Sequence, residues 1–259
     1  MTRKALLFIL FVFSWATPAL AETVRIVAED DWYPYTAFID GKSQGITVDL
    51  VDAIFAAEGH TVEYDSMNYD KAMGLVKDGD ALACFNAPRT VELEGVYLWH
   101  DQMLFPAEGV FFAAADYPGT IHGVAGAAGK TVGLTQGYGY GDEVDSDTGM
   151  VKEYSKNDSI LVQKLIAKRL ELIILFDAIA DYLLPKLGVE DKVKRVGSSG
   201  TIQNYVAFSK KHPDGKKHLD IFNSGFKKIR DNGTYQKILD GWEAKLRATV
   251  PDPAALPSA

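Results

Sequence analysis

The sequence predicts an α/β protein made of two doubly wound units, each a mainly parallel sheet with helices on both faces. Two observations predict this class. Short apolar or β-branched runs alternate with segments whose apolar residues recur at helical spacing, and this alternation occurs twice along the 259 residues. The composition, 47% apolar and 24% charged, is that of an ordinary globular chain with enough apolar side chains for a core under each sheet.

The first unit is expected to alternate three strands with two helices, at residues 24–28, 45–59, 61–64, 69–79 and 81–85. In the first helix Ile46, Leu50 and Ile54 recur at every fourth position, so they share the face that packs on the sheet. Thr47 is expected to cap the start of this helix. This order of elements is typical of a parallel sheet covered on both faces.

The second unit is expected to repeat that order. Its strands fall at 131–134, 151–154 and 172–176, and its helices begin near residue 140, at 158 and at 178. Asp158 is expected to cap the second of these helices. The continuously apolar run at 172–176 predicts a strand that is buried on both faces.

Two extended segments, 110–114 and 205–209, are expected to join the units as a two-strand hinge. The chain would leave the first lobe, build the second, and return to the first before a helical region at 215–246. The predicted division is 22–114 plus 206–246 for the first lobe, 115–205 for the second, and a loose proline-rich tail at 247–259.

The first 21 residues have the pattern of a secretory signal peptide. Arg3 and Lys4 precede an apolar run that is too short to span a bilayer, and Ala19-Leu20-Ala21 has the small-x-small pattern of a cleavage site. Cleavage after Ala21 would release the mature chain into the periplasm. Glu22 follows the cleavage site where a lipoprotein would have cysteine, so no lipid anchor is expected.

Composition excludes several classes of function. A net charge of −8 disfavours nucleic-acid binding, which needs clustered Lys and Arg. Cys84 is the only cysteine, so no intramolecular disulfide forms, and the five histidines lack metal-ligand spacing. We therefore expect no metal and no cofactor. No later run is long and apolar enough for stable membrane insertion, and the absence of G-x-S-x-G or another nucleophile motif predicts no catalytic residues.

Four segments of the mature chain resemble the bacterial extracellular solute-binding proteins of family 3, the group that contains the polar amino-acid receptors of ABC importers. They are Asp31-Trp32-Tyr33-Pro34-Tyr35 with the Gly45–Leu50 helix start, Gly129–Gly137, Arg169–Ile174, and Asp231-Asn232-Gly233-Thr234-Tyr235. The resemblance covers about 22–246. It implies a two-lobed periplasmic-binding-protein-like fold of type II, with a ligand cleft between lobes joined by two strands.

The resemblance also implies a function. The chain is expected to capture a small polar solute, such as an amino acid or a related amine or organic compound, and to deliver it as a monomer to the permease of an ABC transporter. Two alternatives stay open. A few members of the family are enzymes of the cyclohexadienyl-dehydratase type, and the fold also suits a stand-alone ligand-sensing module.

Three candidate ligand-binding residues follow the first predicted strand, where open α/β sheets place their ligands. Trp32 takes the position of the stacking aromatic in the resemblance, with Tyr35 beside it. Asp31 would accept hydrogen bonds from cationic or hydroxyl groups of the solute. The alternative is a solvated acidic turn whose aromatic rings pack inward as core.

Arg89 and Tyr138 are candidates at positions where the resemblance departs from the family. Leu93 stands where a carboxylate-binding Arg is expected, and Arg89 would replace it, or would instead pair with Glu92 or Glu94 on the surface. Tyr138 stands where the family often has a carboxylate-holding Thr, in a glycine-rich loop that either contacts the ligand or is only flexible. Both departures favour a cationic or neutral solute.

Asp177 is the last candidate. It follows the apolar strand that ends at Phe176, and the resemblance places an amine-pairing Asp at Phe176 itself. Since side chains alternate faces along a strand, this shift of one residue matters. Asp177 is therefore expected either to pair with a ligand amine or to cap the following helix.

Overall fold

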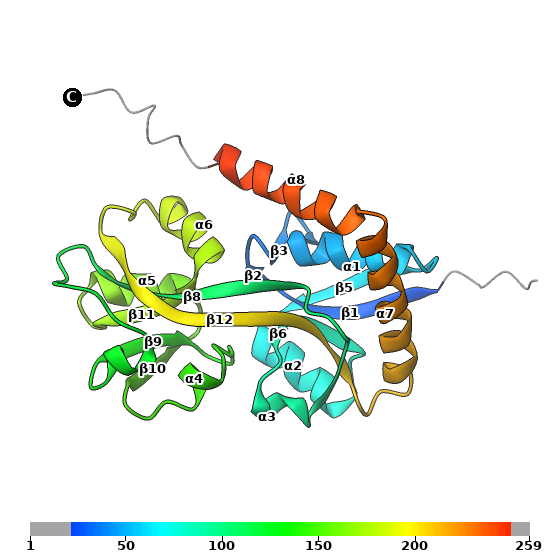
Figure 1. The fold of residues 1–259 in the computed structure, drawn as a ribbon, viewed down its shortest axis with the longest axis horizontal. Helices are drawn as coiled ribbons and strands as arrows, with labels where there is room; N and C mark the ends of the chain where they lie inside the picture. The colour runs from blue at the N-terminus through cyan, green and yellow to red at the C-terminus, as the bar shows by residue number, and fades with distance from the viewer. Residues whose placement is uncertain (1–21, 250–259) are drawn as a thin grey trace, which may run out of the picture.

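The structure is a computed structural model that describes residues 22–249. The expected signal peptide, 1–21, and residues 250–259 of the expected tail lie outside the described residues. The chain forms the predicted α/β fold, with two halves that each contain parallel strands and covering helices (Figure 1).

The first half is built on strands β1, β5 and β6, in the spatial order β5-β1-β6 with parallel pairing. Helices α1 and α2 connect these strands. The elements of this half are β1 Thr23–Glu29, α1 Ile46–Ala56, β5 Thr61–Met67, α2 Tyr69–Asp78, β6 Ala83–Pro88, α3 Val91–Glu94 and β7 Tyr97–Trp99. The alternation predicted for residues 24–85 is confirmed.

The second half repeats this arrangement, with spatial order β10-β9-β11 and again parallel pairing. Its elements are η1 Val124–Ala127, β9 Thr131–Thr135, α4 Asp142–Asp145, β10 Val151–Ser155, α5 Asp158–Ile166, β11 Leu172–Phe176 and α6 Asp177–Leu187. The expected helix near residue 140 begins only at Asp142, after glycines at 137, 139 and 141, and it is a single turn, α4.

Two long antiparallel strands, β8 Phe105–Ala114 and β12 Val193–Ser209, run through both halves in Figure 1. Residues 109–112 of β8 already pair with β11, whereas residues 204–208 of β12 pair with β6. The chain therefore passes between the halves near Phe105–Glu108 and Thr201–Asn204, which pair with each other. These positions lie a few residues before the expected hinge segments, 110–114 and 205–209. The sequence could not separate the two positions, because both strands are extended along their whole length.

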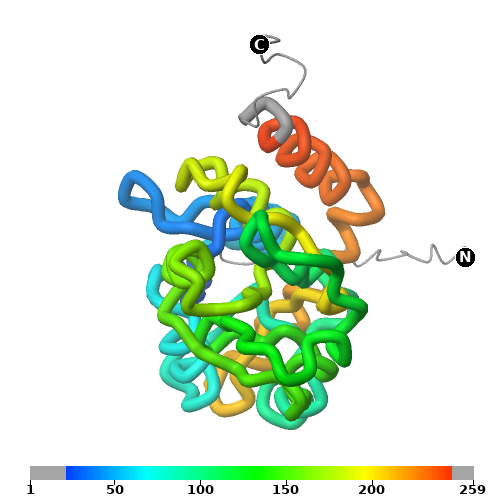
Figure 2. Tube along the Cα trace, turned by 90° about the vertical axis from the view of Figure 1, so that its left-hand side faces the viewer, coloured from blue at the N-terminus to red at the C-terminus, as the bar shows by residue number. Residues whose placement is uncertain are grey.

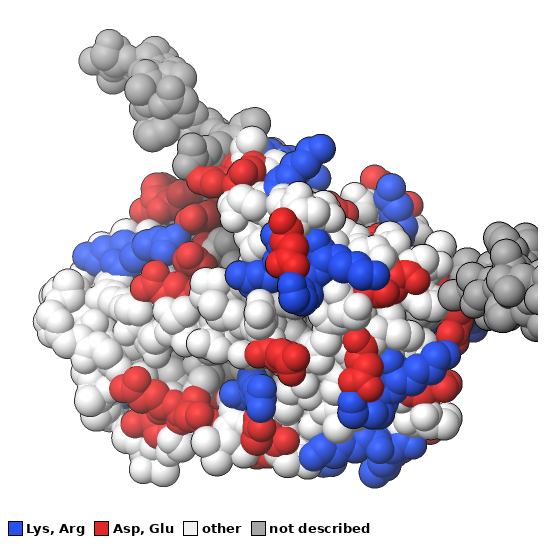
Figure 3. Space-filling model, turned by 45° about the vertical axis from the view of Figure 1, so that its right-hand side comes forward, with Lys and Arg blue, Asp and Glu red and all other residues white. Residues whose placement is uncertain are grey.

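The C-terminal helices α7 Gly215–Asp231 and α8 Thr234–Thr249 cover the outer side of the first half, and α8 lies at its periphery (Figure 2). Trp242 fixes α8 to α1, because its indole Nε1 donates to Asp49 Oδ2 at 2.7 Å. Figure 3 shows acidic and basic side chains interspersed on this side of the molecule. Residues 247–249, expected in the tail, continue α8.

A small antiparallel sheet, which the sequence did not predict, follows β1. Its strands are β2 Asp31–Trp32, β3 Thr36–Ile39 and β4 Lys42–Gln44. It brings the chain back over the end of β1, because the amide of Phe38 donates to the carbonyl of Asp30 at 3.0 Å. The position of Trp32 is therefore set by backbone pairing rather than by a free loop.

Two helix starts differ from the predictions. Gly45, not Thr47, is the N-cap of α1, and the Thr47 hydroxyl donates instead to Asn86 Oδ1 at 2.6 Å. Asn157 caps α5 by accepting from the amide of Ile160, which leaves the Asp158 carboxyl free to point elsewhere. In each helix a buried polar side chain, Thr47 or Asp158, is therefore not used as a cap and contacts another element instead.

Candidate functional site

A small cavity lies where the carboxyl ends of strands from both halves meet. Each half supplies part of its wall, as expected for a cleft at the ends of parallel strands. The lining residues of this inner cavity are Glu29, Trp32, Tyr69, Asn86 and Pro88 from the first half, Tyr138, Gly139 and Phe176 from the second, and Ile202 from β12. Its free space is about 10 Å³, roughly the room of one water molecule.

Aromatic rings form most of this wall. Trp32 is only 3% exposed, and its ring centroid lies 5.4 Å from that of Phe176 and 6.3 Å from that of Tyr138, both edge to face. Tyr69 meets Tyr138 from the other side at 5.6 Å. Such a cage suits the apolar part of a small solute or a cation held over a ring face.

Two N–H donors in the wall have no hydrogen-bond partner among the described residues. They are Trp32 Nε1 and Asn86 Nδ2, both buried. Asn86 adopts a left-handed φ of 62°, and its side-chain oxygen is fixed by Thr47. A buried donor without a partner costs free energy, so these groups are suited to an acceptor atom of a bound solute.

Among the residues that line the inner cavity, only Glu29 carries a carboxyl group. It ends β1 and is buried, and it accepts a short hydrogen bond from the phenol of Tyr138. Burial raises the pKa of Glu29 well above its usual range, and the nearby Asp158 raises it further. An amine cation placed here would stabilise the ionised carboxylate and offset the desolvation.

A second hollow, the acidic pocket, adjoins this region between the small sheet and helices α5 and α6. It has a volume of about 150 Å³, and its polar lining residues are Asp30, Asp31, Tyr33, Asp158, Ser159, Tyr182 and Lys186. Thr135 Oγ1 donates to Asp158 Oδ1 at 2.5 Å, and burial raises the pKa of Asp158 to about 7. Carboxyl groups therefore outnumber the single lysine along this interface.

The interface between the halves combines groups that are suited to non-covalent binding of a small molecule. It offers buried carboxyls, unpartnered donors and aromatic walls. In residues 22–249 no group of three or more His, Cys, Asp or Glu is placed to hold a metal ion. Nor is any helix in this part of the chain long and apolar enough to cross a membrane.

Comparison with known proteins identifies the family. Residues 24–245 match the model of the bacterial extracellular solute-binding proteins, family 3. The chain belongs to this family. A curated relative, the Vibrio harveyi protein PatH, is named as an amino-acid ABC transporter-binding protein; it is 24% identical over 238 residues, which cover 88% of this chain and 92% of PatH.

Solved structures share the fold of this family 3 protein. An ancestral arginine-binding protein bound to arginine matches with a TM-score of 0.72 and 23% identity, over 85% of this chain and 97% of that one. ArtJ of Geobacillus stearothermophilus, an arginine-, lysine- and histidine-binding protein, matches with 0.72 and 18%, over 85% and 94%. A histidine kinase sensor domain matches with 0.75 and 18%, over 85% and 95%.

Three predicted site residues cluster around the hollows. Trp32 lines the inner cavity, and Asp31 lines the acidic pocket, where burial raises its pKa. Tyr35 lies behind Trp32, with ring centroids 4.6 Å apart, and stacks on Phe105 at 4.6 Å. Tyr35 therefore supports the wall rather than facing the cavity.

Arg89 lies outside the inner cavity, although its neighbour Pro88 lines it. Its guanidinium donates to both carboxylate oxygens of Glu94, at 2.5 and 2.6 Å, and lies 5.9 Å from the ring centroid of Tyr205. The side chain is 36% exposed. This geometry is the surface ion pair that was the alternative to a ligand clamp.

The two candidates from the second half differ in position. Tyr138 enters the inner cavity. Asp177 does not line it; Phe176 does, and Phe176 is also the N-cap of α6, without a side-chain capping bond. Asp177 is the first residue of that helix, and its carbonyl accepts from Arg195 at 3.5 Å.

Sequence reasoning missed several residues of the site. Glu29 was not among the candidate residues, and Asp158 was taken as a helix cap. Tyr69 begins a predicted helix, and Asn86 directly follows the strand predicted at 81–85; neither carried a motif. A polar residue at or just after the end of an apolar strand was the available indication for Glu29 and Asn86.

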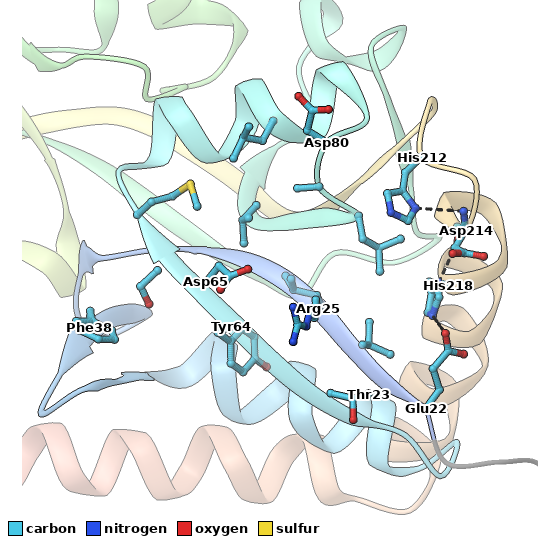
Figure 4. A pocket seen from close by; sticks show the side chains of 18 residues that line it. Glu22, Thr23, Arg25, Phe38, Tyr64, Asp65, Asp80, His212, Asp214 and His218 are labelled. Atoms are coloured by element: carbon cyan, nitrogen blue, oxygen red, sulfur yellow. Dashed lines mark hydrogen bonds and ion pairs between the residues drawn. The ribbon is translucent and has the colours of Figure 1, made fainter.

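A larger groove of about 870 Å³ lies at the far end of the first half (Figure 4). All its lining residues belong to the first half, so the second half cannot close over it. Its histidines already have neighbours: His212 Nδ1 accepts from the amide of Asp214, and His218 Nε2 lies 3.7 Å from a Glu22 carboxylate oxygen. Size alone therefore does not make this groove the solute site.

Proposed function

We propose that this family 3 protein is a periplasmic receptor that binds a small amine-bearing solute, of the amino-acid class, between its two halves. It acts as a monomer and delivers the solute to the permease of an ABC importer. It performs no chemistry on the solute. The name of PatH, an amino-acid ABC transporter-binding protein, supports this class of solute and this partner.

The buried carboxyl of Glu29 is the observation that carries the proposal. It lies at the end of β1, within an aromatic wall and near two further carboxyls, Asp31 and Asp158. A solute amine would pair with Glu29, while Trp32 Nε1 and Asn86 Nδ2 would donate to its acceptor atoms. Ion pairing in such a desolvated site is strong because little water screens it.

Matched pairs of compounds test this proposal. Amino acids and the corresponding 2-hydroxy acids, which differ only in the amine, are added to the mature chain, and the unfolding temperature is measured. A solute present at 100 times its Kd adds about 2.7 kcal/mol to the free energy of unfolding, a readily measured shift. We expect amino acids to raise the unfolding temperature and the hydroxy acids to leave it unchanged.

Three results would count against the proposal. Equal shifts with both members of each pair would show that the amine is not recognised. Conversion of a bound solute into a product, detected by mass spectrometry after incubation, would favour the dehydratase-type enzyme. A bound solute that is recovered unchanged, but whose uptake by cells does not depend on the protein, would favour a sensing module.

A further inference from the structure

The ring of Tyr138 fills the space that a solute would need. It extends from the loop between β9 and α4 and makes edge-to-face contacts with Trp32 and Tyr69, at centroid distances of 6.3 and 5.6 Å. Its phenol donates to Glu29 Oε1. With this ring in place only about 10 Å³ of free space is left. The second half therefore inserts its own side chain into the polar and aromatic wall of the first.

The glycines on either side of Tyr138 show how tightly the loop is pressed against the first half. A Cβ on Gly137 would lie 2.6 Å from Asp70 Cβ, and a Cβ on Gly139 would lie 2.5 Å from Pro88 Cγ. Carbon atoms that are not bonded need more than 3 Å, so only glycine fits at either position. The insertion of Tyr138 thus depends on two residues without side chains.

A hydrogen bond at the end of the same loop joins the halves again. Asp142 Oδ1, at the start of α4, accepts from the amide of Val91 at 3.0 Å. Val91 is the first residue of α3 in the first half, so a carboxylate meets the positive end of a short helix. The loop 137–142 therefore contacts the first half at both ends of the loop, through its glycines at one end and through Asp142 at the other.

We propose that Tyr138 is a built-in occupant of the solute site, so that a solute binds only by displacing its phenol from Glu29 and its ring from Trp32. This inference rests on the proposed function, in that the inner cavity is taken as the solute site. When a side chain competes for the site, the apparent Kd equals the intrinsic Kd divided by the fraction of molecules in which the site is free. If that fraction is about 1 in 100, the apparent Kd is about 100 times the intrinsic value.

Phenol tests the occupancy directly, because it is the part of the side chain that Tyr138→Ala removes. Phenol is titrated by calorimetry into wild type, Tyr138→Ala and Tyr138→Phe. The matched control is Tyr154→Ala, which removes a 57% exposed tyrosine of β10 and opens no cavity. We expect phenol to bind Tyr138→Ala at least tenfold more tightly than the other three proteins.

Benzene then separates the two parts of the contact. It fits between the rings but cannot donate to Glu29, so it should bind Tyr138→Ala several-fold more weakly than phenol does. Phenol binding that is equally weak in all four proteins would overturn the proposal. Circular dichroism checks that each variant is folded. Tyr138→Phe keeps the ring, so it is the variant expected to fold even if Tyr138→Ala does not.

L-Arginine, L-lysine and L-glutamine test the competition. We expect any of these that binds wild type to bind Tyr138→Ala at least tenfold more tightly, and Tyr138→Phe by a smaller factor. Binding that is tenfold weaker in Tyr138→Ala would overturn the proposal, because Tyr138 would then be a contact that holds the solute. If none of the three binds any variant, the proposed function is in doubt, but the phenol titration still decides the occupancy.

Discussion

The inner cavity and the surface pair of Arg89 with Glu94, called here the inner and outer ends, differ in how they use charge. At the inner end, Glu29 is buried among aromatic rings and two N–H donors nearby lack partners. At the outer end, Arg89 is partly exposed and both of its bonded nitrogens are taken by Glu94. The inner end is therefore built to meet a further molecule, whereas the outer end is already satisfied within the chain.

This difference shows why residue type alone does not identify a binding residue. An arginine beside a cleft suggests a carboxylate clamp, but an exposed ion pair contributes little and is screened by salt. A glutamate in a strand is unremarkable in sequence, yet burial makes its charge costly and its pairing strong. Burial and free hydrogen-bonding capacity, rather than charge, distinguish the two ends.

Replacing Trp32 should have the largest effect, because it belongs to both the core and the wall of the inner cavity. Trp32→Ala removes a side chain that is 3% exposed and contacts Tyr35 and Phe176. We expect a loss of about 3–5 kcal/mol in the free energy of unfolding, measured with urea. Trp32→Phe, which keeps a ring, should lose much less, and a similar small loss in both variants would contradict the packing.

Asp158 should make stability depend on pH. Its pKa is about 7 in the folded chain against 3.8 in its ordinary state, so the folded state holds its proton more tightly. The stabilisation is then complete below about pH 4 and is lost as pH rises toward 7, at about 1.4 kcal/mol per pH unit. Glu29, whose pKa is also raised, acts in the same direction.

Urea unfolding of wild type and Asp158→Asn from pH 4 to pH 8 measures this contribution. Asparagine keeps an acceptor for Thr135 but does not titrate. The stability of the variant relative to wild type should therefore increase with pH across this range. Parallel curves would show that Asp158 is not desolvated. Glu153→Gln makes the matched change at an exposed carboxyl on β10 and serves as the control.

Removing the outer ion pair should have the smallest effect. Arg89→Ala breaks the exposed contact with Glu94 and the weak contact with the ring of Tyr205. We expect the unfolding temperature to change by no more than one or two degrees at physiological salt, as measured by calorimetry. A large drop in the unfolding temperature would mean that Arg89 stabilises the contact between the two halves.

Much of the fold could be predicted because local pattern determines it. Apolar periodicity located strands β1, β9 and β11 and helices α1, α2 and α6 within a few residues. The passage between the halves could not be located, because β8 and β12 are extended throughout and only pairing partners divide them. The small sheet was missed because its strands have two to four residues each.

The site was predicted less completely than the fold. Trp32, Asp31 and Tyr138 were predicted as ligand-binding candidates, and they line the two hollows. Glu29 and Asn86 were not predicted, because only the meeting of the two halves shows that these strand residues are enclosed. The pairing of Arg89 with Glu94, five residues away, was one of two alternatives that sequence alone left open.

The most direct test compares neutral replacements of similar size at the two ends, Glu29→Gln and Arg89→Gln. The amino acid that gives the largest thermal shift with wild type is titrated into both variants by calorimetry. We expect at least a 30-fold increase in Kd for Glu29→Gln, because a buried amine would lose its counter-charge, and less than a threefold change for Arg89→Gln. A large loss of affinity in Arg89→Gln with unchanged binding in Glu29→Gln would instead place recognition at the outer end.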